Sequence, residues 1–149
     1  EWAEATELDW PLLDFPAHNG IRSLVRDLNG LLRREPAMHA DDADWKGFNW
    51  VDFSDYQASV ISFIRQSEGA PPVFWIFNFT PVPRHDYRVG CQHFSRYELW
   101  REVLNTDSEY YGGSNLGNPG HINAHDQCWE KGHLTLTLPP LAALALMPV

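Results

Sequence analysis

The sequence predicts a mainly β protein, an antiparallel β-sandwich preceded by a single helix. Three observations lead to this prediction. One segment, residues 17–34, carries apolar residues at the spacing of a helical face. Beyond residue 41 the chain consists of about eight short runs rich in aromatic and β-branched residues, separated by turn signals. Residues 134–138 alternate leucine with threonine, which is the period of a half-buried strand.

The helix is indicated by aliphatic residues that share one face of a helical period: Ile21, Leu24, Val25, Leu28, Leu31 and Leu32. Asn19 is a possible N-cap, and Pro16 could instead begin the helix one turn earlier. Pro36 ends the helix, because the residue before a proline is pushed out of helical geometry. We expect residues 1–16 to form an irregular loop.

The expected strands are short runs bounded by Gly, Pro, Asn, Asp or Ser: residues 48–53, 59–65, 73–79, 87–89, 97–104, 134–138 and 141–147. Residues 73–79 are expected to be central in a sheet, because the run is continuously apolar between Pro72 and Pro81. Leu134, Leu136 and Leu138 should point into the core. We place a boundary between residues 1–40 and a sandwich of residues 41–149.

Composition limits the class of protein. The chain has 149 residues, of which 44% are hydrophobic, and its net charge is -9 at pH 7. An acidic surface repels phosphates, so we expect no nucleic-acid partner. The longest apolar stretch, residues 141–149, is far shorter than the roughly 20 residues that span a bilayer, so we expect no membrane partner. No signal peptide begins the chain, which favours a cytoplasmic location.

The cysteines bear on the location of the protein, and the first residue bears on whether the chain is a segment of a longer one. Cys91 and Cys128 form no CxxC pair, and in a secreted chain they could be linked. Cytosolic thiols are the interpretation we favour. A start at Glu1 rather than at methionine indicates a segment of a longer protein.

Several groups of residues could carry chemistry. The loop of residues 105–120 is rich in glycine, but no Lys-Ser or Lys-Thr pair follows, so we interpret it as structural. A metal cluster could be imagined from residues near this loop: His121, His125, Asp126, Cys128 and His133. Their spacing matches no zinc pattern, and we expect no metal and no cofactor. A Ser-His-Asp triad could still assemble in space, although no nucleophile-elbow motif supports one.

Two further groups of polar residues have ordinary interpretations. The acidic run Asp41, Asp42 and Asp44 is expected to be solvated and to connect the helix to the sandwich. The sequence from Asn78 to Thr80 has the form of a glycosylation acceptor. It lies where we expect a buried strand to end, so we discount it.

Seven tryptophans are many for this length. Trp50 and Trp75 are expected to fill the sandwich core, which is the usual place for such residues. Trp2 and Trp10 lie outside any periodic pattern, in the amino-terminal loop. Because aromatic rings stack on sugar faces, these two are the candidate substrate-binding residues.

The chain resembles the bacterial 1,4-α-glucan (glycogen) branching enzymes of the α-amylase superfamily, essentially from end to end. The order and spacing of several segments carry the resemblance: residues 8–10, 24–29, 78–84, 87–90, 100–102, 104–108, 112–114, 117–118 and 134–142. After Trp2 many members have Asn-His-Asp, whereas this chain has Ala3-Glu4-Ala5.

The resemblance implies a TIM-type catalytic barrel that ends inside this chain. Residues 17–34 would be its last helix and residues 1–16 the loop before that helix. Residues from about 41 onward would form the α-amylase-type C-terminal sandwich that packs beside the barrel. The family cleaves an α-1,4-glucan through a covalent intermediate on an Asp nucleophile, with a Glu as acid and base and a second Asp assisting. It then transfers the cleaved chain to a C6 hydroxyl.

The catalytic carboxylates of such an enzyme stand at the ends of barrel strands, about 5 Å apart in a retaining enzyme. In the family these strands all precede residue 1, so we expect no catalytic residue in this chain and no activity from it alone. The expected partner of the longer enzyme is an α-glucan such as glycogen or amylose.

Two alternatives stay open. The domain could be an autonomous glucan-binding module, or the same part of a related debranching or trehalose-releasing enzyme. The helix stripe would lack its barrel in this chain, and an exposed apolar stripe usually finds a partner. We therefore expect the helix at residues 17–34 to fold back onto the sandwich, to pair with another copy or to fray, and we favour self-association.

Overall fold

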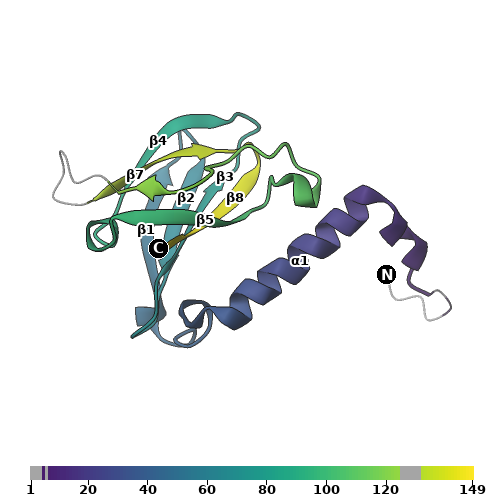
Figure 1. The fold of residues 1–149 in the computed structure, drawn as a ribbon, viewed down its shortest axis with the longest axis horizontal. Helices are drawn as coiled ribbons and strands as arrows, with labels where there is room; N and C mark the ends of the chain where they lie inside the picture. The colour runs from purple at the N-terminus through teal and green to yellow at the C-terminus, as the bar shows by residue number, and fades with distance from the viewer. Residues whose placement is uncertain (1–4, 6, 125–131) are drawn as a thin grey trace.

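The computed structural model describes residue 5 and residues 7–124 and 132–149. In this part of the chain one α-helix, α1 (Pro16–Arg34), precedes eight strands (Figure 1). The strands are β1 (Phe48–Asp55), β2 (Val60–Arg65), β3 (Val73–Asn78), β4 (Arg84–Gly90), β5 (Leu99–Asn105), β6 (Ile122–Asn123), β7 (His133–Leu138) and β8 (Ala142–Pro148). Short 3-10 turns lie before and between these elements: η1 (Trp10–Asp14), η2 (Pro36–Met38), η3 (Trp45–Gly47), η4 (Phe94–Arg96) and η5 (Glu109–Tyr111).

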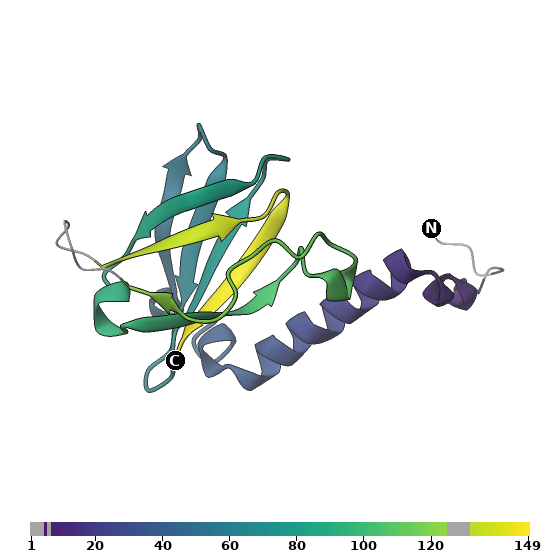
Figure 2. The same cartoon turned by 45° about the horizontal axis from the view of Figure 1, so that its top comes forward.

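The strands form two antiparallel sheets, as the sequence predicts. Six strands lie in the order β1-β2-β3-β8-β5-β6, and β4 pairs with β7 in a second, smaller sheet. The expected central strand is confirmed, since β3 lies between β2 and β8. In Figures 1 and 2 the β4–β7 pair lies across one face of the larger sheet, while α1 leads away from the sandwich towards the N-terminus.

The sandwich core lies between the two sheets. Leu134, Leu136 and Leu138 of β7 are at most 1% exposed, which confirms their predicted inward direction. They pack against side chains of the larger sheet, among them Phe74 of β3 and Trp100 of β5. An alternating strand can face a core with only one of its two sides, so the leucine register determines which face of β7 is buried.

A second apolar cluster lies on the opposite face of the larger sheet, where α1 docks. Leu31 is 3% exposed and packs with Trp75 and Ala145, and Leu24 and Leu28 border the same cluster. Burying one leucine side chain contributes roughly 1.5–3 kcal/mol, so this contact holds the C-terminal half of α1 on the sheet. Part of the predicted apolar stripe therefore has its partner within the chain.

The loop after β5 also contacts the helix. A side chain at Gly20 would clash with the backbone carbonyl of Tyr111, so glycine permits the close approach of η5 to α1. The Tyr111 hydroxyl donates to Asp27 Oδ2 at 3.0 Å. Burial, followed by this hydrogen bond, raises the pKa of Tyr111 to about 12, so the hydroxyl remains a donor at neutral pH.

The helix begins at the proline and not at the asparagine. Pro16 occupies the first helical position, where its missing N–H costs nothing and its fixed φ suits the helix. Phe15 precedes it in an extended conformation, and Asn19 lies inside the first turns. Asn19 as N-cap is therefore wrong, and the Pro16 alternative is confirmed. Residues 10–14 form the 3-10 turn η1 within the expected loop.

Candidate binding pocket

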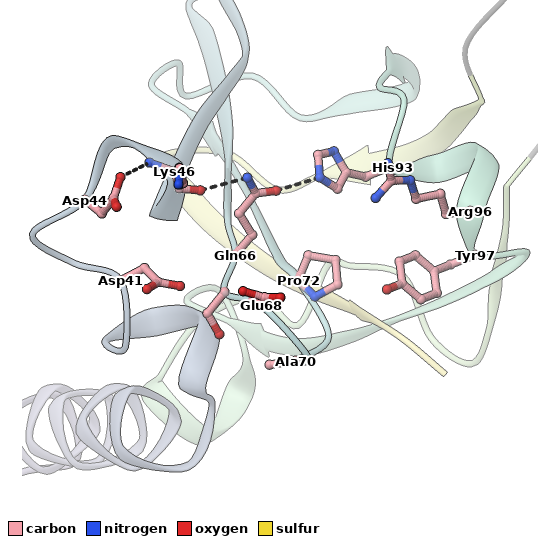
Figure 3. Close-up of a pocket in the computed structure, with 11 residues that line it drawn as sticks. Asp41, Asp44, Lys46, Gln66, Glu68, Ala70, Pro72, His93, Arg96 and Tyr97 are labelled. Atoms are coloured by element: carbon pink, nitrogen blue, oxygen red, sulfur yellow. Dashed lines mark hydrogen bonds between the residues drawn. The ribbon is translucent and has the colours of Figure 1, made fainter.

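Three separate segments surround a polar pocket with a volume of about 350 Å³, which we call the loop-end pocket. They are the turn before β1, the loop between β2 and β3, and the segment around η4 before β5. Figure 3 shows acidic side chains on one side of it and His93, Arg96 and Tyr97 on the other. The lining residues are Asp41, Asp44, Lys46, Gln66, Ser67, Glu68, Ala70, Pro72, His93, Arg96 and Tyr97.

A rigid turn sets the acidic side. Asp44 caps η3, because its Oδ1 accepts the Lys46 amide N–H at 2.9 Å and its backbone carbonyl accepts from Gly47 at 3.0 Å. The Asp44 amide in turn donates to the Asp41 carbonyl at 3.1 Å. A side chain at Gly47 would clash with that carbonyl, so only glycine allows the turn to close this tightly. The turn fixes the backbone that carries Asp41.

A chain of hydrogen bonds crosses the floor of the pocket (Figure 3). Gln66 Nε2 donates to the Lys46 carbonyl at 2.8 Å, so Gln66 Oε1 is the acceptor for His93 Nε2 at 2.7 Å. His93 Nε2 therefore carries the proton, and His93 Nδ1 accepts from Cys91 Sγ at 3.4 Å. This pattern specifies one neutral tautomer and ties the three segments together.

The protonation of His93 should change the free energy of unfolding measurably. Burial, and then the charge of Arg96, lowers the pKa of His93 below its ordinary 6.5. As the pH falls below 6.5, His93 takes up its proton first in the unfolded chain, so the folded state loses stability relative to the unfolded state. We expect the free energy of unfolding in urea to fall less steeply with acidification in His93→Gln than in the original chain. Parallel curves for the two proteins would contradict this assignment.

Tyr97 and Pro72 provide the apolar surface of the pocket. Pro72 is buried, and the half-buried ring of Tyr97 packs edge-on against Trp100 with ring centroids 5.9 Å apart. Trp100 is fully buried, and its Nε1 donates to the Tyr97 carbonyl at 3.1 Å. The Tyr97 ring is thus held from behind, while its hydroxyl points into the pocket (Figure 3).

The acidic run does more than the sequence suggested. It lies at the surface, as expected for a solvated connection, with Asp42 70% exposed. Asp42 also pairs with Arg65 Nη2 at 2.7 Å, and Arg65 donates to the Met38 carbonyl at 3.2 Å. Together with the Asp44 cap, these contacts attach the connection to the end of β2.

Trp10, one of the two predicted ligand-contact tryptophans, does not line this pocket. Trp10 is 65% exposed in η1, at the end of α1 that points away from the sheets (Figures 1 and 2). Trp2 lies outside the described residues. Their role in substrate binding stays a prediction.

Of the two tryptophans assigned to the core, Trp75 is buried and Trp50 is not. Trp75 is 6% exposed, but it lies under α1 on the outer face of the larger sheet and not between the sheets. Trp50 is 47% exposed on that same outer face, so its assignment to the core is wrong. The strand pattern identified β1 but not the face that its tryptophan occupies, because β1 is an edge strand with two register shifts.

Aromatic rings gather on this outer face of β1, β2 and β3. Phe63, Phe77 and Phe79 stack on one another, with centroids 5.6 and 6.0 Å apart. Phe48 lies 5.0 Å from Trp50 in an edge-on contact. A sugar-stacking platform needs ring faces that are open to the ligand. Stacked contacts occupy ring faces of Phe63 and Phe77, whereas Trp50 remains 47% exposed and Phe79 58%.

The remaining candidates have structural roles. Asn78 is 2% exposed and its Nδ2 donates to the carbonyls of Val82 and Pro139, so the glycosylation-like sequence is the buried end of a strand. In the glycine-rich loop the Asp107 carboxylate accepts from the amides of Ser114 and Leu116.

The imagined metal cluster is only partly visible, since His125, Asp126 and Cys128 lie outside the described residues. Within the described ranges no group of three His, Cys, Asp or Glu side chains is placed to hold a metal ion. In the same part of the chain no helix is long and apolar enough to cross a membrane.

The fold and the sequence place the chain in a known family. Residues 50–149 match the family of the alpha amylase C-terminal all-beta domain, and the chain belongs to this family. The fold agrees, since the crystal structure of alpha-amylase from H. orenii superimposes with a TM-score of 0.51 at 13% identity. That similarity covers 85% of this chain and 20% of the amylase chain.

More specific similarity comes from curated relatives. The 1,4-alpha-glucan branching enzyme GlgB of Oleidesulfovibrio alaskensis is 61% identical over 150 residues, covering 100% of this chain and 23% of the relative. The GlgB of Aquifex aeolicus is 48% identical over 149 residues, covering 98% and 23%. The chain thus spans about a quarter of the length of these relatives.

Proposed function

We propose that this chain is the C-terminal portion of a cytoplasmic 1,4-α-glucan branching enzyme, in which it supports a catalytic barrel and supplies no catalytic residue. The observation that carries the proposal is the 61% identity to a GlgB over the whole of this chain. Fold similarity to an amylase alone would not separate branching from other reactions of the superfamily. An α-glucan such as glycogen is then the substrate of the longer protein.

The exposed side of α1 supports the same proposal. Ile21 is 64% exposed, Val25 51% and Leu32 42%, and together they form an apolar ridge beside the face that docks on the sheet. Leaving such a ridge in water is unfavourable. In the longer protein the barrel covers it, with residues 1–40 forming the barrel's end. In the isolated chain the ridge pairs with a second copy.

A segment exchange tests the branching assignment. Residues 1–149 would replace the corresponding segment of the Oleidesulfovibrio alaskensis GlgB, and branching of amylose would be followed by the loss of iodine staining. We expect the hybrid to branch amylose, because 61% identity preserves the contacts that the segment must make. The matched control is the same enzyme with the segment deleted, which should lose activity.

Two outcomes would contradict the proposal. A folded hybrid without branching activity would show that the segment does not belong to this enzyme. Turnover of amylose by residues 1–149 alone, abolished by substitution of one of the chain's own acids, would show that the chain carries catalytic groups.

A further inference from the structure

We propose that the loop-end pocket binds an α-1,4-glucan chain, so that the β-domain holds substrate as well as supporting the barrel. The glucan class rests on the proposed function. The more general part, that the ligand is a neutral polyhydroxyl molecule, rests on the pocket itself.

The size and position of the pocket suit a small ligand. Its volume of about 350 Å³ falls within the range of about 300–1,000 Å³ that small-ligand pockets occupy. The floor contains buried Pro72 and half-buried Gln66, whereas Glu68 and Arg96 stand exposed at the rim. A ligand would therefore rest on a fixed base and meet charged side chains around its edge.

The charge balance favours a neutral ligand. Three carboxylates, those of Asp41, Asp44 and Glu68, oppose the two cationic groups of Lys46 and Arg96. Phosphate would be repelled by the acids, and a divalent cation would be repelled by the lysine and the arginine. Sugar hydroxyls both donate and accept, so they can use the two kinds of group at once.

Polar groups in the pocket have bonding capacity to offer. Among the described residues, the side chains of Asp41, Glu68 and Arg96 and the hydroxyl of Tyr97 make no hydrogen bond. The carboxylates supply acceptors, the guanidinium supplies donors, and the tyrosine supplies either. A row of vicinal hydroxyls, as on a glucose residue, would donate to the acceptors and accept from the donors.

The apolar part of the pocket matches the other aspect of a sugar. A pyranose ring has a face of C–H groups that packs on aromatic rings, while its hydroxyls point outward. Tyr97 offers a ring with a polar end, and Pro72 and Ala70 line the pocket nearby. Because Trp100 fixes Tyr97 and the Gln66–His93 hydrogen bond fixes the floor, little ordering is needed on binding.

The test is an NMR titration of residues 1–149 with maltotetraose, using backbone amide shifts. We expect a dissociation constant on the order of 1 mM, with the largest shifts at Gln66–Ala70 and His93–Tyr97. Glu68→Gln combined with Arg96→Gln should weaken binding at least about tenfold, which corresponds to about 1.4 kcal/mol. Tyr97→Phe keeps the ring and should lose only the contribution of the hydroxyl.

Matched controls separate the pocket from general surface effects. Glu109→Gln and Arg88→Gln remove one charge of each kind at exposed positions outside the pocket, and should change the affinity less than about twofold. Cellotetraose, with β linkages, should bind more weakly than maltotetraose. Equal binding of the two would retain the polyhydroxyl pocket and overturn the α-glucan assignment.

Other outcomes overturn the inference directly. These are the absence of maltotetraose binding, shifts confined to Trp10 or Trp50, or stronger shifts of the pocket amides with inorganic phosphate. If the hybrid enzyme branches amylose while residues 1–149 bind no maltotetraose, the pocket assignment fails and the proposed function stands. If maltotetraose binds in the pocket while the folded hybrid is inactive, the reverse holds.

Discussion

Phe74→Ala should lower the free energy of unfolding by about 3–5 kcal/mol, as removal of a fully buried aromatic ring does. Phe74 is 0% exposed in β3, and its ring meets Phe94 edge-on with centroids 5.1 Å apart. Phe94 makes the same kind of contact with Trp100, so the cavity would open within a continuous aromatic group. Domains are stable by only about 5–15 kcal/mol, so the variant should be close to unfolding.

Urea denaturation followed by circular dichroism measures this effect. The control is Phe53→Ala, which removes the same ring from a position that is 68% exposed. The control should change the free energy of unfolding by about 0.5 kcal/mol or less. Equal losses in the two variants would contradict the placement of the core between the two sheets.

The elements that sequence reasoning identified are those that repeat a local period. The leucines of β7 alternate over the whole strand, and the core face follows from that alternation. The continuous apolar run of β3 identified a strand buried on both faces, which is why Phe74 and Trp75 are both inaccessible although they point in opposite directions. Such features depend only on residues that are neighbours in the chain, so they can be predicted from a single sequence.

The loop-end pocket could not be predicted in the same way. Its residues come from three segments that are 20 to 56 positions apart, and they meet only when η3, β2 and η4 are assembled. Asp41 and Asp44 looked like an ordinary solvated run, and His93 and Arg96 belong to no motif. A weak signal was available in Asp44-Trp45-Lys46-Gly47, because an aspartate followed by a glycine three residues later is typical of a capped turn.

The direction of Trp50 could not be inferred for a different reason. Alternation assigns side chains to faces only if the register is continuous, and β1 departs from it between Trp50 and Asp52. An edge strand with bulges can turn its aromatic residues outward. The docking of α1 on the sandwich was one of three outcomes that the sequence left open, since the stripe shows that a helix has an apolar face but not which half of that face the same chain will cover.

Leu31→Ala tests whether α1 is an integral part of this fold. Leu31 is 3% exposed against the sheet, so truncation should cost about 2–5 kcal/mol and lower the melting temperature of the whole domain. The matched variant is Ile21→Glu on the same helix, at a residue that is 64% exposed. It should leave the melting temperature nearly unchanged and convert self-associated chains to monomers in sedimentation.

The two variants together separate the roles of the two sides of α1. If the helix were only a tail of a preceding barrel, both substitutions would leave the melting of the β-sheets unaltered, and the buried contact of Leu31 would contribute nothing. If Leu31→Ala destabilises the sheets while Ile21→Glu abolishes association, one side of α1 completes the sandwich and the other side is an interface. If the unsubstituted chain is monomeric in sedimentation, the proposed interface is wrong, whereas the docking of Leu31 on the sheet is unaffected.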